Sequence, residues 1–182
     1  LGVPAVGLAG LDGRLLSGRR KSTLTIVEGG KKKVLRDDHT GTITSVNTDL
    51  IRVLYEAGYV LVVCPPAISD NHVAVNVDGD RAAARIAEAV TADDLVILSN
   101  VPGLLRDPDD EATLIPQIAS EALNEHFGYA KGRMKKKLMA AQEALDGGVG
   151  RVVLGDARIA QPIRAALGGR GTVIGRPTDH RA

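Results

Sequence analysis

The sequence predicts an α/β protein, a three-layer αβα sandwich with a mainly parallel central sheet. Two features of the chain lead to this prediction. The apolar runs at residues 59–63 and 95–98 are nearly continuous, which is typical of strands covered on both faces. In the second half, helical patterns separate the predicted strands, and strands joined through a helix pair in parallel by a right-handed crossover.

The first predicted elements are strands. Residues 3–8 have the composition of a strand and run into a glycine-containing turn. The β-prone runs at 23–27 and 32–35 flank a Glu-Gly-Gly-Lys turn, which is typical of a hairpin. The lysines of this hairpin fit a solvated strand edge that resists aggregation.

The rest of the chain is predicted to alternate helices and strands. Asn47 is a suitable cap for a helix that continues to residue 57. Apolar periodicity marks the later helices, and short β-prone runs mark the strands between them. The predicted elements are strands at 59–63, 73–75, 95–98, 151–154 and 172–174, and helices at 80–90, 114–126, from the lysine-rich run to 145, and 159–167.

Composition excludes several classes of protein. The chain has 182 residues, 44% of them hydrophobic, and a formal net charge of +1, which predicts a globular protein without a nucleic-acid partner. It has no apolar run of the ~20 residues that a membrane span needs and no signal peptide, so a cytoplasmic protein is expected. One cysteine allows no internal disulfide, and the spacing of the histidines predicts no metal site.

A polar cluster follows the predicted strand at 73–75. Residues 76–80 read Asn-Val-Asp-Gly-Asp, and aspartate is favoured at a helix start because it accepts hydrogen bonds from free N–H groups. The cluster can therefore be a helix cap. It also holds more polar side chains than one cap needs, so Asn76 can bind a polar group of a substrate while one aspartate orients cationic side chains or a metal.

A second loop follows the buried strand at 95–98, and ligands of α/β sheets bind beyond the carboxyl ends of strands. Residues 99–105 read Ser-Asn-Val-Pro-Gly-Leu-Leu, which can be a plain turn because Pro and Gly supply its backbone geometry. The loop can also bind a nucleotide, with polar groups at the strand end and Val101 and Leu104 against a base. The chain contains no Walker or Rossmann glycine motif.

The third feature is a basic run at residues 131–137, Lys-Gly-Arg-Met-Lys-Lys-Lys, where a helix is predicted to begin. Cations oppose the positive end of the helix dipole, so this run indicates an anionic ligand such as a phosphate. A charged helix surface is the alternative. On an ideal helix, Lys137 lies about 70° from the apolar stripe and Lys136 lies nearly opposite it. Lys137 is therefore the predicted catalytic cation.

In this order the loops resemble the motifs of the amino-acid kinase family, and within it the acetylglutamate-kinase group. The matching segments are residues 41–43 (Gly-Thr-Ile), 46–47 (Val-Asn), 57–59 (Ala-Gly-Tyr), 76–80, 99–104, 132–137 and 169–174. The resemblance covers essentially the whole chain. It implies the family's αβα fold and a reaction that moves the γ-phosphoryl group of ATP, with Mg²⁺, onto a carboxylate to form an acyl phosphate.

The resemblance also implies residue roles. Lys137 resembles the lysine that stabilises the transferring phosphoryl group, Asp80 the aspartate that positions the family's catalytic lysines, and Asn76 the substrate-binding asparagine. The nucleotide-side loops match at Ser99, Asn100, Gly103, Leu104, Gly132 and Met134. These roles agree with phosphoryl transfer, which depends on positioning and charge stabilisation. No protein ligand for Mg²⁺ is evident from spacing.

A narrower resemblance is to kinases that act on substrates attached to an acidic amino-group carrier protein, and segments 10–15, 18–21 and 64–67 carry it. It implies phosphorylation of the side-chain carboxylate of carrier-bound 2-aminoadipate or glutamate, in lysine or arginine biosynthesis. The basic stretch at 14–21 and the hairpin lysines would suit such a partner through steering, with solvated surface charge as the alternative. Free acetylglutamate, the substrate of an N-acetylglutamate kinase, is the alternative substrate.

Part of the family pattern has no counterpart here, namely a K-x-G-G motif and a second Gly-Gly substrate loop. We therefore expect one amino-acid-kinase domain that lacks its N-terminal part, in which residues 1–70 end the substrate lobe and 71–182 form the nucleotide-binding lobe. Such a chain is expected to catalyse little by itself. A non-catalytic nucleotide- or amino-acid-binding fragment is the alternative of another class, and the resemblance also implies a homo-oligomer.

Overall fold

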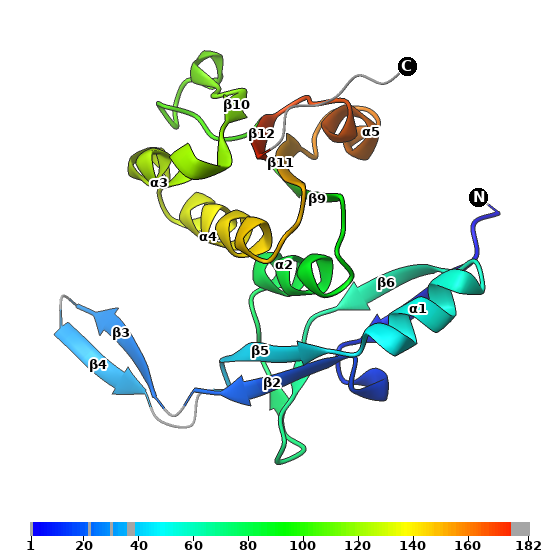
Figure 1. The fold of residues 1–182 in the computed structure, drawn as a ribbon. Helices are drawn as coiled ribbons and strands as arrows, with labels where there is room; N and C mark the ends of the chain where they lie inside the picture. Colours follow the sequence, from blue (N-terminus) through cyan, green and yellow to red (C-terminus); the bar gives the residue numbers. More distant parts are fainter. Residues whose placement is uncertain (1, 22, 30, 36–38, 176–182) are drawn as a thin grey trace. The chain divides into compact units, whose positions relative to one another are not determined.

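The computed structural model describes residues 2–21, 23–29, 31–35 and 39–175. The chain divides into two compact units, Leu1–Ala82 and Ala83–Ala182, and each combines helices with strands (Figure 1). The predicted α/β class is therefore confirmed. In the described part of the chain, no helix is both long enough and apolar enough to cross a membrane.

The first unit is built mainly from short strands. The strands are β1 (Ala5–Ala9), β2 (Leu16–Arg20), β3 (Leu24–Glu28), β4 (Lys31–Leu35), β5 (Gly41–Val46), β6 (Val60–Cys64), β7 (Ala67–Ile68) and β8 (Ala74–Val75). β1 pairs in parallel with β6, and a second sheet has the order β5-β2-β7-β8. β3 and β4 form the predicted antiparallel hairpin, whose lysine side chains lie outside the described part.

Asn47 caps α1 (Thr48–Glu56) in the first unit, as predicted. Its Oδ1 accepts a hydrogen bond from the Leu50 N–H at 3.2 Å, which satisfies one of the free donors of the first turn. Its Nδ2 donates to the carbonyl of Gly13 at 2.9 Å, just after the start of η1 (Asp12–Arg14). Asn47 therefore fixes both the helix start and the loop that precedes β2.

The second unit is a three-layer αβα sandwich, which confirms the predicted architecture there. Its sheet has the order β10-β12-β11-β9, formed by β9 (Asp94–Ser99), β10 (Gln117–Ile118), β11 (Arg151–Asp156) and β12 (Thr172–Gly175). β9 and β11 are parallel, and β12 is antiparallel to β11. Two helices, α4 (Arg133–Asp146) and α5 (Pro162–Leu167), lie on opposite sides of these strands (Figure 1).

The side chains of β11 alternate between the two faces of the sheet and contribute to the core on both sides. Val152 and Leu154 are fully buried in a cluster that contains Leu138 of α4, together with Ala84 of α2 (Gly79–Ala89). The intervening Val153 packs instead with Ala166 of α5. Successive residues of a strand point to opposite faces of the sheet, so this one apolar strand packs against the helices on both sides. This double burial explains the uninterrupted apolar run Val152–Leu154 of β11. The prediction that the strand at 59–63 is covered on both faces is wrong, because Val60 and Val62 of β6 are exposed.

The predicted helix at 114–126 is wrong. The chain instead forms η2 (Glu111–Thr113), β10, η3 (Ser120–Ala122), α3 (Leu123–His126) and η4 (Phe127–Tyr129). Pro116 explains the difference, because proline has no N–H and disfavours the helical conformation of the residue before it. The carbonyl of Pro116 accepts a hydrogen bond from the Val173 N–H at 2.9 Å, which leads β10 into its parallel pairing with β12.

The predicted helix at 159–167 is confirmed only from Pro162 onward. Gln161 has a φ of 51°, in the left-handed region, so the regular helix cannot extend back through it. Proline at the first helical position suits this start, because its fixed φ is already helical. The consequence is a longer loop between β11 and α5, which begins directly after Asp156 at the end of β11 and carries Arg158.

Candidate active site

A pocket of about 420 Å³ opens at the carboxyl end of β9, within the second unit. Three segments line it: the end of β9 with its loop, the Pro108 region, and residues between Tyr129 and Lys137 of α4. Ligand sites of α/β sheets occupy this position, beyond the strand ends. The lining residues are Leu98, Ser99, Asn100, Val101, Gly103, Leu104, Leu105, Pro108, Tyr129, Lys131, Arg133, Met134 and Lys137.

A buried threonine holds the loop that follows β9. The Oγ1 of Thr172 accepts a hydrogen bond from the Leu104 N–H at 2.8 Å and donates to the carbonyl of Ile115 at 2.7 Å. Thr172 has no exposed surface, so both bonds are shielded from water. A buried polar group that satisfies two backbone partners is costly to replace. Thr172 thus ties the strand-end loop to the segment that enters β10.

Gly103 has a steric role in the same loop. A Cβ added to Gly103 would lie 2.5 Å from Oγ1 of Thr172 and 2.8 Å from Cδ1 of Leu114. It would also lie 2.9 Å from the backbone nitrogen of Thr172, which cannot move without disturbing β12. The glycine of the Ser-Asn-Val-Pro-Gly-Leu sequence is therefore needed for close packing and not only for a turn.

The basic run places three of its five cations at the pocket. α4 begins at Arg133, preceded by Gly132 with a φ of 53°. Lys131, Arg133 and Lys137 line the pocket, and Lys137 is half-buried whereas the other two are exposed. Lys135 and Lys136 are exposed and do not belong to the lining. The structure thus selects Lys137 from the three consecutive lysines, in agreement with the helical-wheel prediction of its position.

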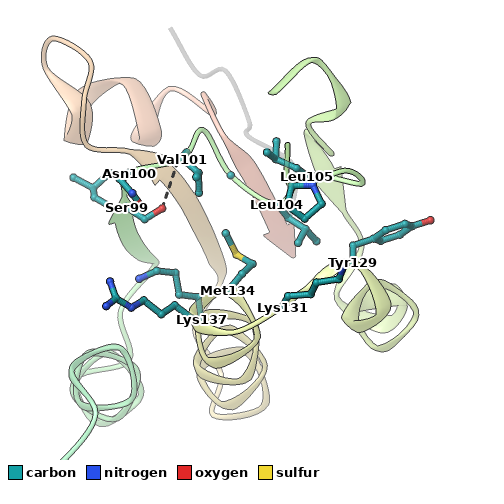
Figure 2. Close-up of a pocket in the computed structure, with 13 residues that line it drawn as sticks. Ser99, Asn100, Val101, Leu104, Leu105, Tyr129, Lys131, Met134 and Lys137 are labelled. Carbon is teal, nitrogen blue, oxygen red and sulfur yellow. Dashed lines mark hydrogen bonds between the residues drawn. The ribbon is translucent and has the colours of Figure 1, made fainter. Parts of the chain in front are cut away.

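The remaining lining is largely apolar. Leu104 and Leu105 are buried at the base of the strand-end loop, and Val101 is half-buried beside them. Met134 extends from α4 toward this loop, as does Lys137 (Figure 2). Ser99 Oγ donates to the carbonyl of Val101 at 3.4 Å. An apolar surface beside three cations can accept a flat, partly apolar group together with an anion.

Two predicted residues belong to the first unit. Asn76 lies between β8 and α2, and its backbone carbonyl accepts a hydrogen bond from the Gly41 N–H at 2.9 Å. Asp78 caps α2, because its Oδ1 accepts from the N–H groups of Asp80 at 3.1 Å and Arg81 at 3.3 Å. The cap that the cluster requires is therefore made by Asp78. The half-buried Asp80 side chain is not needed for it.

The structure brings six of the predicted residues together at one pocket, namely Ser99, Asn100, Gly103, Leu104, Met134 and Lys137. Gly132 lies between two lining residues, Lys131 and Arg133, without lining the pocket itself. Pro108 and Tyr129 also line the pocket, and no sequence motif indicates either of them. The one feature of the sequence that could indicate Tyr129 is the rarity of aromatic residues, because the chain contains only three tyrosines and one phenylalanine. Pro108 lies in an acidic loop with no motif, and nothing local indicated it.

A charged cluster lies beside the end of β9. Asp156, the last residue of β11, pairs in register with Ser99. Its two carboxylate oxygens accept hydrogen bonds from Nε and Nη2 of Arg158 at 2.9 Å and 2.8 Å. These side-chain bonds lower the pKa of Asp156 from 3.8 to about 2, against the opposing effect of its burial. Asp156 is therefore a fixed anion at neutral pH.

Substituting Arg158 with Gln is expected to return the pKa of Asp156 toward 3.8. A carboxylate whose folded-state pKa is depressed stabilises the fold above its unfolded pKa and loses this contribution as pH falls toward the folded pKa. Asp156 should therefore contribute fully above about pH 4 and progressively less down to about pH 2. NMR titration of the Asp156 carboxyl carbon measures both values. An unchanged pKa in the variant would contradict the assigned cause.

Comparison with known proteins places the chain in a family. The model of the amino acid kinase family matches residues 1–156. The chain belongs to this family. It is 58% identical over 174 residues to the [LysW]-aminoadipate kinase of Deinococcus radiodurans, covering 96% of this chain and 60% of the relative. It is 52% identical to the same-named kinase of Thermus thermophilus, covering 95% of this chain and 65% of the relative.

The chain is also similar to proteins with other names. The acetylglutamate kinase of Methanopyrus kandleri is 37% identical over 95% of this chain and 67% of the relative. Among solved structures, N-acetylglutamate synthase of Neisseria gonorrhoeae superposes with a TM-score of 0.76 at 24% identity, over 96% of this chain and 38% of that chain. Carbamate kinase of Giardia lamblia superposes with a TM-score of 0.66 at 15% identity, over 96% of this chain and 66% of that chain. These two structures support the fold alone.

Proposed function

We propose that the protein to which this chain belongs is an ATP-dependent carboxylate kinase. It transfers the γ-phosphoryl group of ATP to the side-chain carboxylate of 2-aminoadipate, or of glutamate, attached to an acidic amino-group carrier protein. The observation that carries this proposal is a pocket with three cations and an apolar wall in a chain that closely resembles two [LysW]-aminoadipate kinases. The chain spans 60% and 65% of the lengths of those kinases.

The pocket fits an adenine nucleotide. The apolar part around Val101, Leu104 and Met134 suits the flat base, because adenine offers two π faces and carries no charge. Lys131, Arg133 and Lys137 suit the phosphates, since charge-assisted hydrogen bonds from lysine and arginine bind phosphate oxygens. A volume of about 420 Å³ is within the usual range for small-molecule sites.

The reaction needs little covalent participation from the protein. An oxygen of the substrate carboxylate forms a bond to the γ-phosphorus while the bond from that phosphorus to the β–γ bridging oxygen breaks. The products are an acyl phosphate and ADP, and no general base is needed because the carboxylate is already anionic near pH 7. Lys137 stabilises the negative charge on the transferring group, which is the main demand of phosphoryl transfer.

Magnesium is proposed to enter with the nucleotide. In the described ranges, no group of three or more His, Cys, Asp or Glu side chains is placed to hold a metal ion. Mg²⁺ commonly binds substrate phosphates and water with only one or two protein carboxylates. Mg²⁺ bound together with ATP would supply additional charge neutralisation on the phosphates.

The other proposed roles concern the first unit. Asn76 is proposed to bind the acyl substrate, and Asp80 to orient cationic side chains near the phosphates. The basic stretch at 14–21 is proposed to attract the acidic carrier protein, since complementary charge raises association rates. In this stretch Arg14 forms an exposed ion pair with Asp70 at 3.5 Å, so its charge is partly engaged within the chain. That the protein forms a homo-oligomer remains a prediction.

A second candidate function is N-acetylglutamate kinase, favoured by the 37% identity to an enzyme of that name. The two are separated by measuring ADP formation by the full-length protein with carrier-bound aminoadipate, carrier-bound glutamate and free acetylglutamate. We expect turnover of a carrier-bound substrate and little of the free one. Turnover of acetylglutamate alone would establish the second candidate, and no turnover of any of the three would favour a non-catalytic binding protein.

A further inference from the structure

The Asp156–Arg158 pair is connected to a wall of the pocket that no sequence motif marks. We infer that Arg158 is a positioning residue for the nucleotide site, because it holds the loop of residues 105–114, here called the wall loop, at a fixed place through Glu111. This inference rests on the proposed function, since it concerns the same pocket. The wall loop supplies Leu105 and Pro108 to the pocket lining.

The wall loop is stiff along its own length. Its two ends are bridged by Leu105 and Leu114, and just beyond them the Ile115 N–H donates to the Leu104 carbonyl at 2.9 Å. The Arg106 N–H donates to the Thr113 carbonyl at 3.1 Å. A short loop whose ends are hydrogen-bonded to each other moves as one rigid unit. A contact on the side away from its ends therefore fixes the position of the whole wall loop.

Thr113 secures the inside of the wall loop. Its Oγ1 donates to the Asp110 carbonyl at 2.6 Å and accepts from the Asp107 N–H at 3.0 Å. Asp110 in turn caps η2, accepting from the Ala112 N–H at 2.9 Å. These bonds enclose Pro108. Its place at the pocket therefore follows from the orientation of the loop rather than from a local rearrangement.

A charged contact near its far side joins the wall loop to the rest of the second unit. Nη2 of Arg158 donates to Oε1 of Glu111 at 2.8 Å. The same guanidinium is held by Asp156, whose side chain is only 12% exposed at the end of β11. The Ala157 N–H also donates to the Ser99 carbonyl at 2.7 Å. Arg158 thus joins the wall loop to the strand end that forms another part of the pocket.

The energetic argument depends on Asp156. An isolated exposed ion pair contributes little, because two long side chains must be ordered to form it. Here the planar fork of Arg158 is already fixed by two parallel hydrogen bonds to Asp156, so the contact with Glu111 orders only one further side chain. Neither Arg158 nor Glu111 lines the pocket. Loss of the contact should therefore weaken nucleotide binding and leave the chemical step nearly unchanged.

The test uses the full-length protein and calorimetric titration with ATP. Arg158→Gln and Glu111→Gln should each raise the Kd for ATP by about 5-fold, with kcat within about twofold of wild type. The double variant should bind ATP no more weakly than Arg158→Gln does, because both changes break the same contact between Arg158 and Glu111. Arg158→Lys should recover part of the affinity. Hydrogen exchange at the backbone amides of residues 106–107 and 109–113 should accelerate in both single variants.

The matched control is Arg85→Gln. Arg85 forms a comparable ion pair with Glu88 at 2.5 Å on α2, and neither residue lines the pocket. If Arg158→Gln binds ATP as tightly as Arg85→Gln does, the inference is wrong while the proposed function stands. Fully additive effects of the Arg158 and Glu111 changes would also overturn it. If the wild-type protein binds no ATP, the proposed function itself fails, and this inference fails with it.

Discussion

Replacing Lys137 with Ala in the full-length protein is expected to lower kcat by about 30- to 900-fold, which corresponds to about 2–4 kcal/mol of transition-state stabilisation. Lys137 is the half-buried cation of the pocket, so its charge acts through less water than the exposed Lys131 and Arg133. The effect should appear mainly in kcat and less in the Kd for ATP. Steady-state kinetics combined with nucleotide titration separates the two quantities.

Lys135→Ala provides the matched control for this substitution. It removes the same charge from the same helix, at an exposed position outside the pocket lining. We expect the kcat of this variant to stay close to wild type. A Lys137→Ala enzyme that retained kcat within about threefold of the control would contradict the role assigned to Lys137.

The second large effect is expected at Thr172. Thr172→Val keeps the shape of the side chain but removes the hydroxyl, leaving the Leu104 N–H and the Ile115 carbonyl without their buried partner. Each unsatisfied buried group costs ~1–3 kcal/mol, so the free energy of unfolding should fall by about 2–6 kcal/mol. Because Leu104 lines the pocket, ATP binding should weaken as well. Urea unfolding and ATP titration measure the two effects.

Thr172→Ser separates the hydroxyl from the packing of the methyl group. Serine can keep both hydrogen bonds and loses one methyl, which typically costs ~1 kcal/mol in a packed core. We therefore expect the serine variant to be clearly more stable than the valine variant. Equal stability of the two would mean that the hydrogen bonds of Thr172 do not hold the strand-end loop.

Local patterns were sufficient to predict the parts of the fold that one segment determines. The buried strands β9 and β11, the helix α4 and the cap at Asn47 follow from apolar runs, helical periodicity and a polar residue at a helix start. The position of Lys137 also followed from periodicity alone. Helical geometry fixes which lysine of a run lies nearest the apolar face, and that face packs on the sheet.

The parts that were not predicted depend on contacts between distant segments. The segment after Leu114 has apolar spacing that suits a helix, but Pro116 prevents one and β12 offers a strand partner instead. The hydrogen bonds of Thr172 connect residues 57 and 68 positions apart, which no local window contains. The wall loop is held through Arg158, 47 positions from Glu111. Contacts between residues so far apart in the sequence form only when the chain has folded, so local sequence patterns do not indicate them.

The central claim, that the pocket serves an ATP-dependent carboxylate kinase, is tested most directly by trapping the product with hydroxylamine. The full-length protein is incubated with ATP, Mg²⁺ and carrier-bound 2-aminoadipate, and hydroxamate is measured against ADP. The account predicts hydroxamate and ADP in equal amounts, both lost when ATP or the carrier-bound substrate is omitted and both strongly reduced in Lys137→Ala. ADP formation without hydroxamate, or no ADP at all, would contradict it.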